Sequence, residues 1–96
     1  MPFTWQININ KNSSGTGFHY DPNPLQDVAS NDQIIWTNNT DHPHWPCLPG
    51  NQNAFMAQQI APHSPSSTFI PGSAGTVSYI DFLNPTAPGG SFNVTS

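Results

Sequence analysis

Apolar and polar residues alternate over several short stretches of this chain, which is the period of a β-strand with one buried face. The longest such stretch covers residues 3–10, and its predicted inward positions are Phe3, Trp5, Ile7 and Ile9. Residues 91–95 repeat the alternation near the other end of the chain, with Phe92 and Val94 inward. Both stretches therefore predict half-buried strands.

Further strands are predicted between these two, each bounded by turn-forming residues. Residues 33–37 (QIIWT) are dense in apolar and β-branched residues, which suits a central strand. Residues 18–20 form a short extended piece that ends at the D-P-N-P run of residues 21–24, because proline fixes φ and lacks a backbone N–H. Residues 68–70 and 76–82 predict two strands on either side of a Pro-Gly turn.

One window departs from this rhythm. Residues 53–60 (NAFMAQQI) have helix-like propensity and predict either about two helical turns or irregular structure. No other stretch has helical character, and no internal repeat divides the 96 residues. About six to eight short strands in a chain of this size predict a single all-β domain over residues 1–96, folded as a β-sandwich.

The charge pattern excludes several classes of partner. Lys11 is the only basic residue against five acids, which gives a net charge of -4. Nucleic acid and anionic membrane surfaces both attract clustered Lys and Arg, so neither is an expected partner. No run approaches the roughly 18 apolar residues of a membrane span, and no charged-then-apolar signal opens the printed chain. A surface of Asn, Gln, Ser and Thr suggests an exported protein, periplasmic or extracellular.

Potential metal ligands gather in residues 31–50, which hold two of the four histidines and the only cysteine. His42 and His44 form a His-x-His pair, and an extended chain would send both rings the same way. His63 lies in a later loop, in the segment IAPHSP. Cys47 has no partner for an internal disulfide, so it is a buried thiol, a metal ligand or an intermolecular handle.

Residues 38–44 (NNTDHPH) resemble the Asn-Asn-x-x-x-Pro-His segment of plastocyanin-like cupredoxins, in which the last histidine is the first copper ligand. Residues 75–81 (GTVSYID) are similar to the strand that delivers the copper-binding cysteine in that family, and a loop and a final strand follow. The resemblance covers most of the chain. It implies a cupredoxin-like fold, which is an antiparallel Greek-key β-sandwich, with copper at His44 and a partner protein for electron transfer or copper delivery.

The other copper ligands of that family are replaced here. The cysteine place falls on Asp81, the histidine place near Asn84 and the methionine place near Gly89. A blue copper centre needs a thiolate beside two imidazoles, so only Cys47 from a different loop could rebuild one. Some small cupredoxin-like domains that share the His-Trp-Pro of residues 44–46 carry histidines where Ile80 and Phe82 stand here. The rest of the segment matches these domains, whereas the two histidine positions hold apolar residues in this chain.

In one interpretation the histidines still form a metal site without a cysteine. His44, His42 and His63 would supply three imidazoles to a colourless or pale Cu(II) or Zn(II) site, with Asp81 or water as a further ligand. Cys47, three residues after His44, is a further candidate. In the other interpretation the imidazoles are solvated or bonded to backbone, and Cys47 is a small buried apolar residue.

Asp81 has the strand parity of Val77 and Tyr79, so it is expected to face the core. A carboxylate buried there needs a partner. That partner is either a metal or the amides of Asn38 and Asn39 together with loop backbone, and the second interpretation is favoured.

Two functions follow from these interpretations. The first is a small copper-binding protein with a non-blue, histidine-based site. The second is a copper-free cupredoxin-like domain with a structural or protein-interaction role, in which self-association is expected. The sequence contains no nucleophile elbow, no phosphate-binding Gly-rich loop and no pair of acidic residues within a catalytic motif, which predicts that the protein is not an enzyme. An apolar surface at the site mouth, or plain core, is predicted from Trp45, Phe55, Met56 and Phe82.

Overall fold

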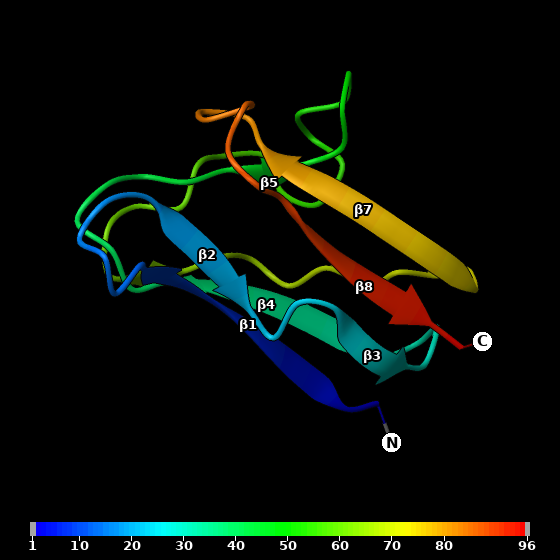
Figure 1. Cartoon of the computed structure of the whole chain (residues 1–96). Coiled ribbons are helices and arrows are strands. Elements are labelled where there is room, and N and C mark those ends of the chain that lie inside the picture. The colour runs from blue at the N-terminus through cyan, green and yellow to red at the C-terminus, as the bar shows by residue number, and fades with distance from the viewer. Residues whose placement is uncertain (1, 96) are drawn as a thin grey trace.

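Residues 33–37, dense in apolar side chains, form the centre of the first of two β-sheets in the computed structural model, which describes residues 2–95. The strands of this sheet lie in the order β2-β1-β4-β6 (Figure 1). Their bounds are Thr4–Lys11 for β1, Phe18–Asp21 for β2, Gln33–Asn38 for β4 and Ser64–Pro65 for β6. β4 lies between β1 and β6, so the predicted central strand is confirmed.

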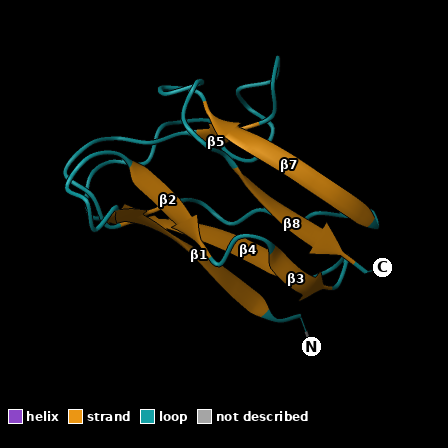
Figure 2. Ribbon diagram, viewed as in Figure 1, coloured by secondary structure: helices purple, strands orange, loops and turns teal. Residues whose placement is uncertain are grey.

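The second sheet packs over the first and has the order β3-β8-β7-β5. Its strands are Leu25–Val28 (β3), Pro46–Cys47 (β5), Gly75–Asp81 (β7) and Gly90–Val94 (β8). The all-β sandwich is confirmed. Both sheets are mixed rather than antiparallel throughout, because β1 runs parallel to β4 and β3 runs parallel to β8. Figure 2 shows that the described chain outside these strands is loop and turn.

The core between the sheets is built by the alternating residues. Ile7 and Ile9 of β1 and Phe92 of β8 have no exposed surface, and Trp36 of β4 packs with them as the largest fully buried side chain. Phe3 is an exception, since it is 57% exposed and the prediction that it faces the core is wrong. The paired strand begins only after it, at Thr4.

Two other local predictions need correction or completion. Residues 68–70 do not form a strand, because only Phe69 bridges Ile34 and the ladder beside β4 is supplied by β6 instead. Residues 53–60 are irregular, which is one of the two predicted outcomes. This segment buries Phe55 and Met56 side by side, and the backbones of Ile60 and His44 exchange two hydrogen bonds of 2.7 and 3.2 Å.

The loops that follow β4 and β7 meet at one end of the sandwich, at the left and top of Figure 1. β4 ends at Asn38, and β7 ends at Asp81. The two-residue strand β5 pairs with the last residues of β7, which sets Pro46 opposite Asp81. This pairing brings residues 38–45 next to residues 81–84. We call this region the ligand end, because it contains most of the predicted site residues.

Candidate functional site

His44 is buried at the ligand end, with 3% of its surface exposed, and both of its ring nitrogens have partners. Nδ1 lies 2.6 Å from Oδ2 of Asp81, and Nε2 lies 3.0 Å from the hydroxyl oxygen of Thr40. Its backbone is fixed by the two hydrogen bonds with Ile60. The ring therefore joins the loop after β4 to the end of β7, across the two sheets.

The carboxylate of Asp81 is 1% exposed and is surrounded by donors, so the prediction that it faces the core is confirmed. Besides His44, it accepts hydrogen bonds from the backbone N–H of Trp45 at 2.8 Å, the backbone N–H of Leu83 at 3.0 Å and the side-chain amide of Asn84 at 2.9 Å. The predicted loop-backbone partners are present. The predicted partners Asn38 and Asn39 are wrong, since the amide of Asn38 bonds to backbone carbonyls and that of Asn39 to Asn8 and Asn10.

These contacts set the charge of Asp81. Burial alone would raise the pKa of the Asp81 carboxyl, but the hydrogen bonds from His44, Asn84 and the two backbone N–H groups outweigh it and hold the pKa below its usual value. Asp81 is thus a buried anion at neutral pH. Burial, followed by the charge of Asp81, raises the pKa of the Tyr20 hydroxyl and of the Cys47 thiol.

Asn38 and Thr40 build the support beneath His44. The Asn38 side chain is fully buried at the end of β4 and accepts the Thr40 N–H at 2.9 Å, a local turn that Asn forms readily. Its amide nitrogen contacts the carbonyls of His42 at 2.7 Å, Ile60 at 3.2 Å and Ala61 at 3.2 Å. The hydroxyl of Thr40 lies 2.8 Å from Asn38 Oδ1. The hydrogen bonds of Asn38 and Thr40 therefore hold the loop after β4 in place.

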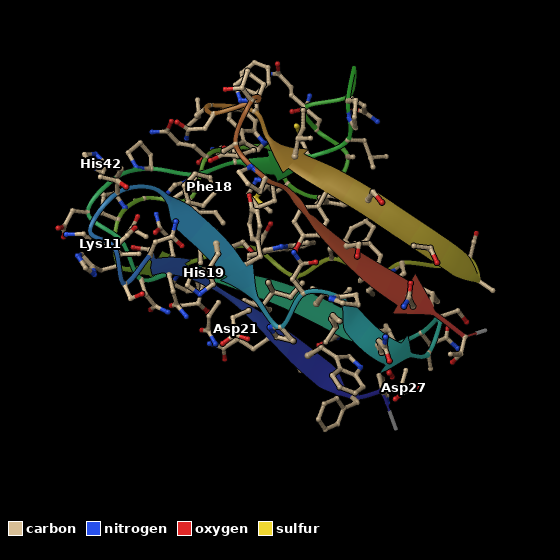
Figure 3. All side chains as sticks on the ribbon, in the orientation of Figure 1. Lys11, Phe18, His19, Asp21, Asp27 and His42 are labelled. Atoms are coloured by element: carbon tan, nitrogen blue, oxygen red, sulfur yellow. The ribbon has the colours of Figure 1, made fainter. Side chains whose placement is uncertain are left out.

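An open cleft of about 300 Å³ borders this network. Figure 3 shows His42, Lys11 and Phe18 on this side of the molecule. The residues that line the cleft are Lys11, Gly15, Gly17, Phe18, Thr40, Asp41, His42, His44 and Asn84. Basic and acidic side chains are both present in it.

The predicted metal ligands are distributed over different parts of the ligand end. His42 is exposed at the cleft. His63 is also exposed, and its Nε2 lies 2.8 Å from Oδ1 of Asp41. Cys47 is buried and lies opposite Ile80 in the pairing of β5 with β7, one position away from Asp81. Successive residues of a strand point to opposite faces, so the Cys47 thiol and the Asp81 carboxylate lie on opposite faces of the sheet. Among residues 2–95, no cluster of three or more His, Cys, Asp or Glu side chains is arranged to hold a metal ion.

Sequence reasoning missed the roles of Thr40 and Asn84 at this site. An Asn-x-Thr after a central strand is a signal for a side-chain-to-backbone turn, and it could have indicated that Asn38 and Thr40 act together. No sequence signal indicated that the amide of Asn84 bonds to Asp81. That contact depends on the turn after β7, in which Asn84 N–H donates to the Asp81 carbonyl at 3.1 Å.

No protein-family model and no curated protein matches this chain. Solved structures do match, and they show that the chain has a cupredoxin-like fold. Several of them are amicyanins. Amicyanin from Paracoccus versutus superposes with a TM-score of 0.71 at 15% identity, covering 95% of this chain and 80% of that one. The Cu(I) form of an amicyanin variant gives 0.71 at 18% identity, over 98% and 84% of the two chains, and a reduced variant gives 0.71 at 19%, over 98% and 91%. At these identities the likeness establishes the fold alone.

Proposed function

We propose that this protein is a copper-free cupredoxin-like domain with a structural or protein-interaction role. The observation that carries the proposal is the set of contacts around His44 and Asp81, the residues at the positions that resemble the histidine and cysteine ligands of cupredoxins. In this chain the two side chains bond to each other, at 2.6 Å. A direct contact of this length leaves no space for an ion between the two atoms.

The donor groups at the ligand end are already engaged with one another. A histidine binds copper through a nitrogen lone pair, and a blue site adds a thiolate. Asp81 engages Nδ1 of His44, Thr40 engages Nε2, and the Cys47 thiol is directed to the other face of the sheet from Asp81. Each oxygen of Asp81 already accepts two hydrogen bonds. The buried residues of the ligand end therefore do not fit copper in this arrangement.

An exposed apolar patch beside the network supports an interaction role. It consists of Trp45, Phe82 and Leu83, with Phe82 44% and Leu83 38% exposed. The rings of Trp45 and Phe82 pack edge to face with centroids 5.4 Å apart, and the Phe82 N–H donates to the Trp45 carbonyl at 2.8 Å. Phe55 and Met56, predicted as further members or as core, are core. The hydrogen bonds of Asp81 to Trp45 and Leu83 hold the backbone of this patch in place.

Self-association through this patch is the interaction that we propose to test first. The sedimentation coefficient of the protein should rise with concentration, and Phe82→Ser should reduce the rise without unfolding the domain. Ile70→Ser is the matched control, because Ile70 is comparably exposed, at 54%, but lies outside the patch. A concentration-independent monomer would leave the domain without a self-association role, and equal effects of the two variants would exclude this patch as the contact.

Copper or zinc binding by His44, His42, His63, Cys47 and Asp81 stays a prediction. The observation in its favour is that His42 and His44 border the same cleft. It implies that Cu(II) raises the thermal midpoint of the wild-type protein and that His44→Gln removes the increase. The copper-free proposal implies the same midpoint with and without Cu(II). No helix among residues 2–95 is long and apolar enough to cross a membrane. An exported location stays a prediction. Under the copper hypothesis, so does a redox or copper-delivery partner.

A further inference from the structure

The hydrogen atoms around His44 can be assigned from the fixed groups at the base of the network. Asn38 is the starting point, because its amide nitrogen contacts three carbonyl oxygens, those of His42, Ile60 and Ala61. Carbonyl oxygens only accept, so the side chain can be oriented in one way. Its Oδ1 then accepts from the Thr40 backbone N–H. Asn38 Oδ1 is therefore an acceptor with no hydrogen to give.

Thr40 passes this constraint on to His44. The Thr40 hydroxyl has a single hydrogen, and it lies 2.8 Å from Asn38 Oδ1 and 3.0 Å from the carbonyl oxygen of His42. Both of these atoms only accept, so the hydroxyl hydrogen belongs to one of them. Two further atoms lie close to it, the backbone N–H of His42 at 3.3 Å, which only donates, and Nε2 of His44 at 3.0 Å. Since the hydroxyl has no second hydrogen to donate, Nε2 must donate to it.

The other ring nitrogen faces Asp81. Nδ1 and Oδ2 are 2.6 Å apart, which is the distance of a short, charge-assisted hydrogen bond and requires a hydrogen between them. The two backbone N–H groups and the Asn84 amide all stabilise the ionised form of Asp81, which places that hydrogen on Nδ1.

We infer that His44 is a buried imidazolium, paired with the Asp81 carboxylate and supported by Thr40, at the position that resembles a cupredoxin's first copper ligand. The ring of Phe18 adds a contact that suits this charge, since the two ring centroids are 4.2 Å apart and aromatic faces attract cations within about 6 Å. An imidazolium has no lone pair for a metal. A proton thus replaces the ion at this end of the fold.

The other titratable groups near the pair leave this charge balance intact. Tyr20 and Cys47 interact with the charge of Asp81, and burial together with that charge raises their pKa values, so both are neutral at pH 7. Asp41, His42 and Lys11 line the cleft on the other side. Asp41 is paired with the exposed ring of His63. Asp81 is therefore the anion in direct contact with His44.

This inference deepens the proposed function and rests on its premise that His44 and Asp81 bond to each other. The two fail separately, however. The copper-free proposal fails if Cu(II) displaces the proton and stabilises the protein, whereas the inference concerns the protonation of the metal-free chain.

The test is nitrogen NMR of the metal-free full chain with ¹⁵N-labelled histidine, in the presence of a chelator at pH 7. We expect two ring N–H signals for His44 that exchange slowly with water. The ¹⁵N chemical shifts of both ring nitrogens should lie in the range of an imidazolium. The ring of His42, which is exposed, supplies an internal reference. A ring nitrogen of His44 with the signature of a free lone pair in the wild-type protein would overturn the assignment.

Two variants separate the ion pair from general packing. Asp81→Asn keeps the size of the side chain and removes its charge, so one ring nitrogen of His44 should lose its hydrogen. Asp32→Asn changes a carboxylate at the opposite end of β4 and should leave the His44 signals in place. Persistent double protonation in Asp81→Asn would contradict the role of the carboxylate. If Asp81→Asn does not fold, the wild-type spectrum still decides the protonation state.

Discussion

Two buried carboxylates stand at opposite ends of this sandwich, and they are satisfied in different ways. Asp32 lies just before β4 and accepts hydrogen bonds from Phe3 N–H at 2.9 Å, Trp5 Nε1 at 2.9 Å and Ala29 N–H at 3.0 Å. All three donors are neutral. Asp81 also has three neutral donors, and it has the ring of His44 in addition.

The comparison shows that neutral N–H groups are enough to stabilise a buried, ionised carboxylate in this protein. The N–H of Phe3, followed by those of Trp5 and Ala29, lowers the pKa of Asp32 without a positive side chain in contact. The ring of His44 is therefore not needed merely to satisfy Asp81. Its added effect is to connect Asp81 to Thr40 and Asn38, and so to join the end of β7 to the end of β4.

The largest expected effect is the loss of Asp81. Asp81→Ala removes the partner of the buried His44 ring, which must then give up a hydrogen or stay charged without a counter-ion, and removing one member of a buried ion pair typically costs about 3–5 kcal/mol of unfolding free energy. Urea unfolding measures this. Asp32→Ala is the matched control and should cost less, because it leaves only neutral donors unpaired. Equal losses would show that the two ends are alike and would remove the basis of the comparison.

A smaller effect is expected at Thr40. Thr40→Val keeps the shape of the side chain but leaves Asn38 Oδ1 and His44 Nε2 without the hydroxyl, and an unsatisfied buried polar group costs about 1–3 kcal/mol. Unfolding in urea at pH 7 checks the size. A loss below about 0.5 kcal/mol, the usual range of surface changes, would mean that water replaces the hydroxyl and that Thr40 does not orient the ring.

Acid should weaken both ends of the sandwich, and the contribution of the ligand end can be isolated. The pKa of Asp81 is lower in the folded protein than its ordinary value of 3.8, so its contribution to stability is fully present above that pH. It is lost as the pH falls below about 3.8 and through the folded-state pKa, because the unfolded chain then binds the proton more readily. In Asp81→Asn the fall in unfolding free energy between about pH 5 and pH 2 should be shallower, by the contribution of roughly that single group. An unchanged slope would assign the acid sensitivity elsewhere, to Asp32 for example.

The smallest effect on stability is expected at the surface patch. Phe82→Ser should lower the unfolding free energy by no more than about 1.5 kcal/mol, because Phe82 is 44% exposed, its main contact is the edge-to-face pair with Trp45, and the hydrogen bonds of Asp81 do not involve its side chain. Urea unfolding of this variant measures the change. A large loss would mean that Phe82 is part of the support of the ligand end, and the separation between patch and network would have to be given up.

Most strands could be predicted from the sequence, because one buried face imposes a period of two residues. The inward direction of Asp81 could also be predicted, from the parity of β7. The loop-backbone partners of Asp81 could be predicted, but its partner His44 could not, because His44 lies 37 residues away and the contact depends on how two sheets close over each other. The sequence predicts the Asn38 amide as a partner of Asp81, and that prediction is wrong. The amide of Asn38 instead bonds to three backbone carbonyls that the loop turns inward, which no local pattern encodes.

The measurement that tests the central claim most directly is a Cu(II) titration of metal-free protein, followed by electron paramagnetic resonance, for the wild type and for His44→Gln. If His44 and Asp81 hold a proton between them, the two proteins should give the same weak binding from their exposed histidines. His42→Ala should reduce that binding more than His44→Gln does. A tight site at one equivalent, with a signal that disappears in His44→Gln, would contradict the account and would make His44 a copper ligand.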